Sequence, residues 1–133
     1  MAIYKASCIT EELYHKVVDT VFVLSQELAT NAANVSKLIK LSKMIVKDAY
    51  IVIKELKTLN HIDFLISTYC AMFKDTFNRL KNIYAFTIPQ YRHTEMESLL
   101  INGYDKIFDI LEAFTVLRFR FMFKPNNSYT LRD

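Results

Sequence analysis

The chain has 133 residues and a formal net charge of +3; 52% of its residues are hydrophobic and 23% are charged. This balance excludes a disordered charged tail, and one compact domain is the default at this length. The apolar runs are interrupted well short of the ~18–20 residues that a membrane span needs. One glycine and two prolines supply few of the turns that a sheet-rich domain requires, so we expect an all-α fold.

Cysteine usage and the N-terminal sequence bear on the compartment. Cys8 and Cys70 have no metal-ligand spacing and make no disulfide framework, and residues 1–10 carry no evident secretory signal. We expect an intracellular protein, cytoplasmic or, if the source is eukaryotic or viral, nuclear. Abundant Ile, Lys and Asn with a single Gly is typical of an AT-rich genome, such as that of some viruses.

The first predicted helix spans about residues 10–30. Thr10 is a good N-cap, and Glu11 and Glu12 follow in the first turn, where carboxylates favour the positive end of the helix dipole. Apolar residues at helical spacing form its expected buried stripe: Leu13, Val17, Val21, Leu24 and Leu28.

The second predicted helix, about residues 35–59, has two faces of opposite character. Its apolar series is Leu38, Leu41, Ile45, Ala49, Val52, Leu56 and Leu59. A second series lies two residues out of phase, about 200° around the helix. This series, here named the lysine stripe, consists of Lys40, Lys43, Lys47, Tyr50, Lys54 and Lys57.

The third and fourth helices are predicted at about residues 61–87 and 94–122. Residues 35–87 form either one long helix or two, and base rates for helix length favour two. Pro89 ends the third helix, and Thr94 with Glu97 reads as a capping box that starts the fourth. The fourth carries a heptad-like apolar seam: Met96, Leu100, Gly103, Ile107, Ile110, Phe114, Leu117 and Phe121.

Short connections between four such helices predict an up-down antiparallel four-helix bundle. We assign residues 1–124 to this domain and residues 125–133 to a flexible polar tail. Six lysines against two acids give residues 35–59 a charge of +4, while five acids against one lysine give residues 94–117 a charge of −4. We expect the second and fourth helices to lie diagonally, with these charges on opposite sides of the bundle.

No pattern in the chain predicts catalytic chemistry. Glu12-x-x-His15 is a Glu-x-x-His spacing, which di-iron bundles use in duplicate together with two further glutamates, but here it occurs once. Phosphate-loop and dinucleotide motifs need more glycines than this chain has. We therefore expect a protein that is not an enzyme, with no catalytic residues, no metal site and no cofactor.

One short segment resembles a known family. The sequence from Asn102 to Phe108, Asn-Gly-Tyr-Asp-Lys-Ile-Phe, leads into an apolar helix and slightly resembles the Asn-Trp-Gly-Arg segment of Bcl-2-type proteins. The Trp, Gly and Arg are not in register, and the similarity covers about 15 residues. The resemblance implies a divergent viral helical protein that modulates its host.

Two surfaces are candidate binding sites. The lysine stripe could contact nucleic-acid phosphates, and a segment of alternating cations and aromatics near the C-terminus offers side chains to a partner. The candidate residues of that segment are Arg118, Phe119, Arg120 and Phe123. The leading hypothesis is a protein–protein interaction module that self-associates as a homo-oligomer, with nucleic-acid binding through the lysine stripe as the alternative.

Overall fold

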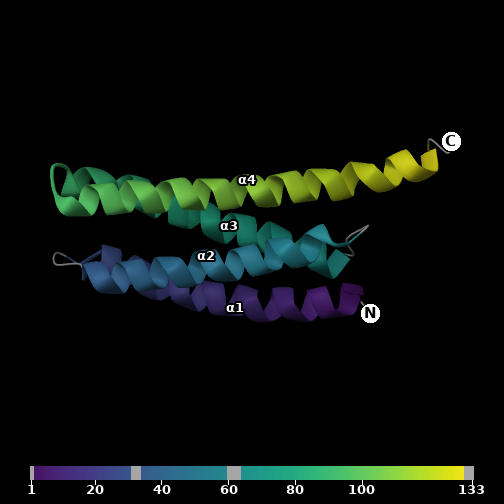
Figure 1. Ribbon diagram of the computed structural model, residues 1–133, viewed down its shortest axis with the longest axis horizontal. Coiled ribbons are helices and arrows are strands. Elements are labelled where there is room, and N and C mark those ends of the chain that lie inside the picture. The colour runs from purple at the N-terminus through teal and green to yellow at the C-terminus, as the bar shows by residue number, and fades with distance from the viewer. Residues whose placement is uncertain (1, 31–33, 60–63, 131–133) are drawn as a thin grey trace.

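Four long helices and one short 3₁₀ helix make up the computed structural model, which describes residues 2–30, 34–59 and 64–130, with side chains for 5–30, 34–59 and 64–119. The α-helices alternate in direction (Figure 1). The predicted all-α, up-down four-helix bundle is confirmed. The elements in chain order are α1 (Ala2–Leu28), α2 (Val35–Lys57), α3 (Phe64–Thr87), η1 (Ile88–Tyr91) and α4 (Glu95–Thr130).

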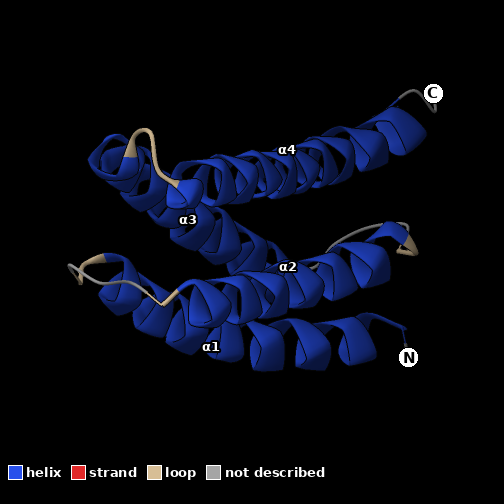
Figure 2. Cartoon of the chain, turned by 60° about the vertical axis from the view of Figure 1, so that its left-hand side comes forward, coloured by secondary structure: helices blue, strands red, loops and turns tan. Residues whose placement is uncertain are grey.

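The helices form two antiparallel hairpins, α1–α2 and α3–α4, that pack on each other (Figure 2). Helix α1 contacts α2 and α3, and α4 contacts α2 and α3. Among the described residues, no Cα atom of α2 lies within 8 Å of one of α3, and none of α1 lies within 8 Å of one of α4. The order around the bundle is therefore α1, α2, α4, α3.

This order corrects the prediction that the second and fourth helices lie diagonally. Helices α2 and α4 are parallel neighbours, and the diagonal pairs are α1 with α4 and α2 with α3. The connection from α2 to α3, which spans residues 58–63, is long enough to permit this order. Six residues reach about 20 Å when extended, more than the ~14 Å diagonal of a bundle whose neighbouring helices are about 10 Å apart.

The helix ends differ from the predicted bounds in two places. Helix α1 begins at Ala2, and Thr10 lies inside it, fully buried, so Thr10 is not an N-cap. Ala6 and Thr10 are both buried, so the buried stripe extends about two turns further towards the N-terminus than Leu13, its first predicted member. Helix α4 continues past residue 122 to Thr130. The division into a 1–124 domain and a flexible 125–133 tail stays a prediction.

Local hydrogen bonds start the other helices. The Asn34 side chain caps α2 by accepting from the backbone N–H of Lys37 at 3.0 Å. At α4 the predicted capping box takes another form. The Glu97 carboxylate accepts from the N–H of His93 at 3.2 Å, and the Thr94 hydroxyl donates to the Tyr91 carbonyl. The predicted start of the third helix at 61 lies outside the described residues, and α3 is helical from Phe64.

A cluster of aromatic rings fills the centre of the bundle. Phe73 stacks on Phe114 with ring centroids 5.3 Å apart and also lies 6.3 Å from Phe77. Tyr14 of α1 meets the edge of Phe73 at 5.3 Å, so the rings join α1, α3 and α4. In the described part of the chain, no helix combines the length and hydropathy needed to span a membrane.

Candidate functional site

The lysine stripe lies on the outer side of α2. Within residues 34–59 all six of its members are exposed. No carboxylate in the described part of the chain lies within 4.0 Å of Lys40, Lys43, Lys47, Lys54 or Lys57. Their positive charges therefore face solvent, with no carboxylate partner among the described residues.

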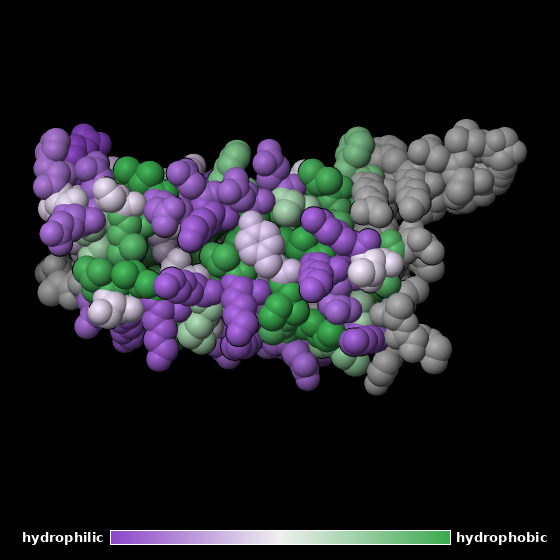
Figure 3. All heavy atoms as spheres, viewed as in Figure 1, coloured by the Kyte–Doolittle hydropathy of each residue, from purple (hydrophilic) through white to green (hydrophobic). Residues whose placement is uncertain are grey.

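Acidic residues of α4 border the same side of the molecule as the lysine stripe. A groove of about 490 Å³ between α2 and α4 is lined by Tyr50 and Lys57 from one helix and by Asp109 and Glu112 from the other. Figure 3 shows this side, where hydrophilic side chains of both helices surround smaller apolar patches. We name it the α2–α4 face. Because the two helices are neighbours, one face carries both signs of charge.

The predicted C-terminal surface is divided by the structure. Arg118 is half-buried and lines a groove between α3 and α4, whereas Phe119 is 63% exposed. The side chains of Arg120 and Phe123 lie outside the described residues. Along the described part of α4, Arg118 and Phe119 thus belong to different surfaces.

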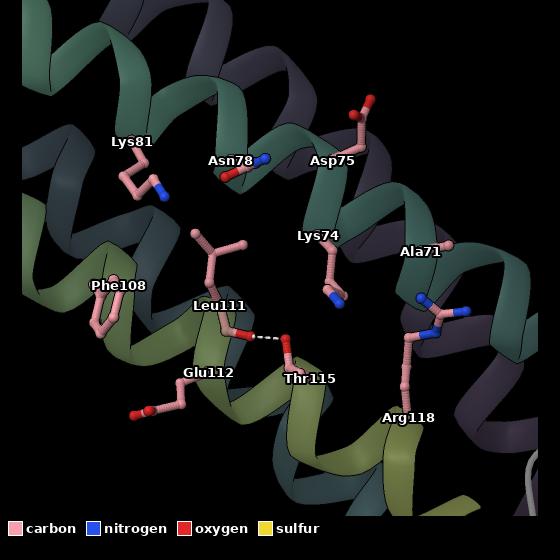
Figure 4. Close-up of a pocket in the computed structure, with 10 residues that line it drawn as sticks. All are labelled: Ala71, Lys74, Asp75, Asn78, Lys81, Phe108, Leu111, Glu112, Thr115 and Arg118. Atoms are coloured by element: carbon pink, nitrogen blue, oxygen red, sulfur yellow. Dashed lines mark hydrogen bonds between the residues drawn. The ribbon is translucent and has the colours of Figure 1, made fainter. Parts of the chain in front are cut away.

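The groove between α3 and α4 gathers three cations. It has a volume of about 520 Å³. Lys74 and Lys81 enter it from α3, and Arg118 reaches into it from α4 (Figure 4). All three side chains are half-buried, and none has a carboxylate within 4.0 Å among the described residues. We name it the α3–α4 groove.

Neither acidic residue that lines the α3–α4 groove neutralises these cations. Asp75 points away from α4 in Figure 4, and its carboxylate pairs with Arg79 on its own helix at 3.2 Å. Glu112 also points away from the cations. The Thr115 hydroxyl donates to the Leu111 carbonyl at 2.9 Å, which leaves the hydroxyl oxygen as an acceptor only.

Sequence reasoning missed Lys74 and Lys81. They are seven residues apart, which places them on one side of α3, and this spacing was a usable signal. Arg118 is distant in sequence, and only the antiparallel pairing of α3 and α4 brings it to the same groove.

Reactive and ligating residues are dispersed. Cys8 is exposed, while Cys70 is fully buried and its burial raises the pKa of the thiol to about 12, against a smaller lowering effect of Arg118. Cys70 therefore stays a neutral thiol at physiological pH. Glu12 and His15 are both exposed. Within the described ranges, no three His, Cys, Asp or Glu side chains are close enough together to hold a metal ion.

Gly103 allows α3 to approach α4 closely. A Cβ atom at this position would lie 2.6 Å from Cε2 of the Tyr84 ring. Tyr84 is buried; burial raises the pKa of its phenol, and a side-chain hydrogen bond with Ser42 of α2 lowers it. Tyr84 thus extends from α3 over Gly103 towards α2.

Comparison of the chain with known proteins gave no match to a family model, to a curated protein or to a solved structure.

Proposed function

We propose that this protein is a non-enzymatic helical interaction module that pairs with a second copy of itself through the α2–α4 face. The observation that carries the proposal is the position of the lysine stripe beside the acidic side of α4. Both sets of charges are exposed, so the bundle itself leaves them available to a partner. A face with one positive and one negative border is complementary to itself in one defined orientation.

That orientation follows from symmetry. Most homodimers have a two-fold axis, and each surface patch then meets the same patch of the partner. An axis parallel to the helices, lying between the two faces, places α2 of one copy opposite α4 of the other. Lys57, Asp109 and Glu112 line the same groove in one subunit, and this axis does not shift the copies along the helices, so opposite charges meet in the same part of the interface. An axis perpendicular to the helices would oppose lysines to lysines.

Two exposed side chains supply apolar contact on the same face. Tyr50 is 45% exposed and Val116 is 60% exposed, and both line the groove between α2 and α4. Tyrosine is a frequent anchor of protein interfaces because it buries a large rigid ring and keeps a polar end. Charge would orient the encounter, and the apolar side chains would supply affinity.

Nucleic-acid binding remains the alternative use of the lysine stripe. Each lysine could contact a phosphate and release counterions. The neighbouring acidic side of α4 opposes this alternative, because Asp109 and Glu112 would repel a polyanion lying along α2.

A charge-reversal experiment tests the proposal. The variant Lys47→Glu/Lys54→Glu places acids on the α2 border opposite the acids of the partner's α4, and Asp105→Lys/Asp109→Lys places lysines on the α4 border opposite those of the partner's α2. At about 100 μM protein, where a micromolar dimer is nearly all associated, we expect the parent to sediment as a dimer and each variant as a monomer. An equimolar mixture of the two variants should restore the dimer mass, and so should the chain that carries all four changes.

The matched control is Glu12→Lys/Asp19→Lys, which reverses two exposed acids on α1 and changes the charge by as much as Asp105→Lys/Asp109→Lys does. This control should sediment like the parent. A monomeric parent, or variants that do not dimerise when mixed, would contradict the proposal. If the parent instead binds duplex DNA or RNA near about 100 mM salt, and only the lysine variant loses that binding, the nucleic-acid alternative replaces it.

A further inference from the structure

We propose that the α3–α4 groove binds a nucleoside di- or triphosphate, with Lys74, Lys81 and Arg118 holding the phosphates. Glu112 borders both this site and the α2–α4 face, but Lys74, Lys81 and Arg118 lie outside that face, so the site does not depend on self-association. The inference starts from three cations that converge from two helices on one groove (Figure 4).

The electrostatic state of the groove favours an anion. Half-buried cations lose part of their hydration, and a carboxylate or a bound anion normally compensates that cost. Here Asp75 is paired with Arg79, and Glu112 points away. The α1–α2 hairpin shows the contrast. Lys16 of α1 and Lys37 of α2 each have a carboxylate of the neighbouring helix at 3.4 Å.

The geometry of the donors suits phosphate. Lys74 and Arg118 approach from opposite walls of the groove, and Asn78 lies on α3 between Lys74 and Lys81. Phosphate oxygens accept several charge-assisted hydrogen bonds at once, and a guanidinium can offer two parallel donors to them. Three cations match the charge of two or three linked phosphates.

The groove also offers a surface for a base. Phe108 lines it on α4 near Lys81, and its ring is 49% exposed. Leu111 adds an apolar side chain beside it. Aromatic rings stack on nucleobases with useful affinity and little sequence preference. A volume of about 520 Å³ is within the usual range for small-molecule sites.

The site extends along α3. A second hollow of about 540 Å³ shares Ala71, Asp75 and Arg118 with the groove and is bordered by Tyr14 of α1. Arg118 therefore lies where the two hollows meet. A ligand with its base at Phe108 has room for its phosphate chain to continue past Lys74 to Arg118.

Calorimetric titration of the full chain with ATP, tripolyphosphate and adenosine tests the proposal. We expect saturable ATP binding with a dissociation constant below about 1 mM, weaker binding of tripolyphosphate and no measurable binding of adenosine. Lys74→Gln/Arg118→Gln should weaken ATP binding about tenfold or more. Because Arg118 is half-buried, Lys81→Gln serves as a second, single change, with a loss in the same direction and an unchanged melting temperature.

Two controls separate the site from general attraction of anions. Lys43→Gln/Lys47→Gln removes the same charge from α2 and should leave ATP affinity unchanged. Phe108→Ala should lower affinity for ATP and leave that for tripolyphosphate as it was. Absence of saturable ATP binding, an equal loss in the α2 control, or a tripolyphosphate affinity equal to that of ATP would overturn the proposal. Tighter binding of a single-stranded oligonucleotide that displaces ATP would also overturn it, in favour of a nucleic-acid ligand.

Discussion

The two hairpins of the bundle use charge in opposite ways. Between α1 and α2, Lys16 pairs with Asp48 and Lys37 pairs with Glu27, both at 3.4 Å. Between α3 and α4, no ion pair joins the helices within the described residues. That contact depends instead on stacked rings and on the close approach at Gly103.

This difference explains which charges are available to a partner. The α1–α2 hairpin places a carboxylate beside each of two inter-helix cations, Asp48 beside Lys16 and Glu27 beside Lys37. The α3–α4 hairpin is held by stacked rings. The cations of its groove have no carboxylate within 4.0 Å among the described residues. Whether a cation has a carboxylate beside it thus depends on the residue opposite it on the neighbouring helix.

The largest effect is expected for the stacked rings that hold α3 against α4. Phe73 is fully buried and touches rings on two other helices, so Phe73→Ala removes contacts and leaves a cavity. We expect a loss of about 3–5 kcal/mol in the free energy of unfolding, measured with urea. The control is Phe86→Ala on the same helix, where the ring is 77% exposed and the change should be below about 0.5 kcal/mol. Equal losses would contradict the aromatic core.

Gly103→Leu tests the close approach of α3 and α4. Its side chain would enter the space of the buried Tyr84 ring, and overpacking of this kind costs about 1–3 kcal/mol of unfolding free energy. Adding Tyr84→Ala should recover part of the loss, because the two positions then no longer compete for space. If Gly103→Leu alone unfolds at the same urea concentration as the parent, Gly103 has no packing role.

Lys16→Met tests the ion pair between Lys16 of α1 and Asp48 of α2. It leaves the Asp48 carboxylate, whose side chain is 3% exposed, without its cation. We expect a loss of about 1–2 kcal/mol, less than for a fully buried pair because Lys16 is 52% exposed. Lys40→Met on the outer side of α2 removes an unpaired lysine and should change stability by less than about 0.5 kcal/mol. A similar loss in both variants would mean that the Lys16–Asp48 pair contributes nothing.

The smallest effect concerns Glu27 at the α1–α2 turn. A hydrogen bond from the N–H of Asn34, 2.7 Å from Oε2, lowers the pKa of Glu27 below 4.5; partial burial opposes this, and Lys37 adds to it. A lowered folded-state pKa contributes stability that is present above the unfolded pKa and is lost as pH falls through the folded value. Glu27→Gln should therefore destabilise the protein slightly at pH 7, and the difference should shrink as pH falls below 4.5 and disappear below the folded-state pKa of Glu27. A difference that persists in acid would assign the effect to packing.

Much of the local structure could be predicted because it depends on nearby residues. Leu38, Ile45 and Val52 of α2 are buried as the apolar period indicated, and the lysine stripe is exposed. The start of α1 was missed because Thr10 is a good cap by residue type, although buried Ala6 continues the stripe before it. Helix ends depend on tertiary burial as well as on local caps, so residue type alone does not define them.

The two candidate sites also differ in how far the sequence predicts them. The sequence by itself determined four amphipathic helices and the side of α2 on which the lysines lie, since helical periodicity is a property of neighbouring residues. Only the tertiary structure decided that α4 lies beside α2, and that Arg118 meets Lys74 and Lys81 across a groove. Helix neighbours are selected by packing and by the reach of the connections, which no periodic pattern within one helix contains.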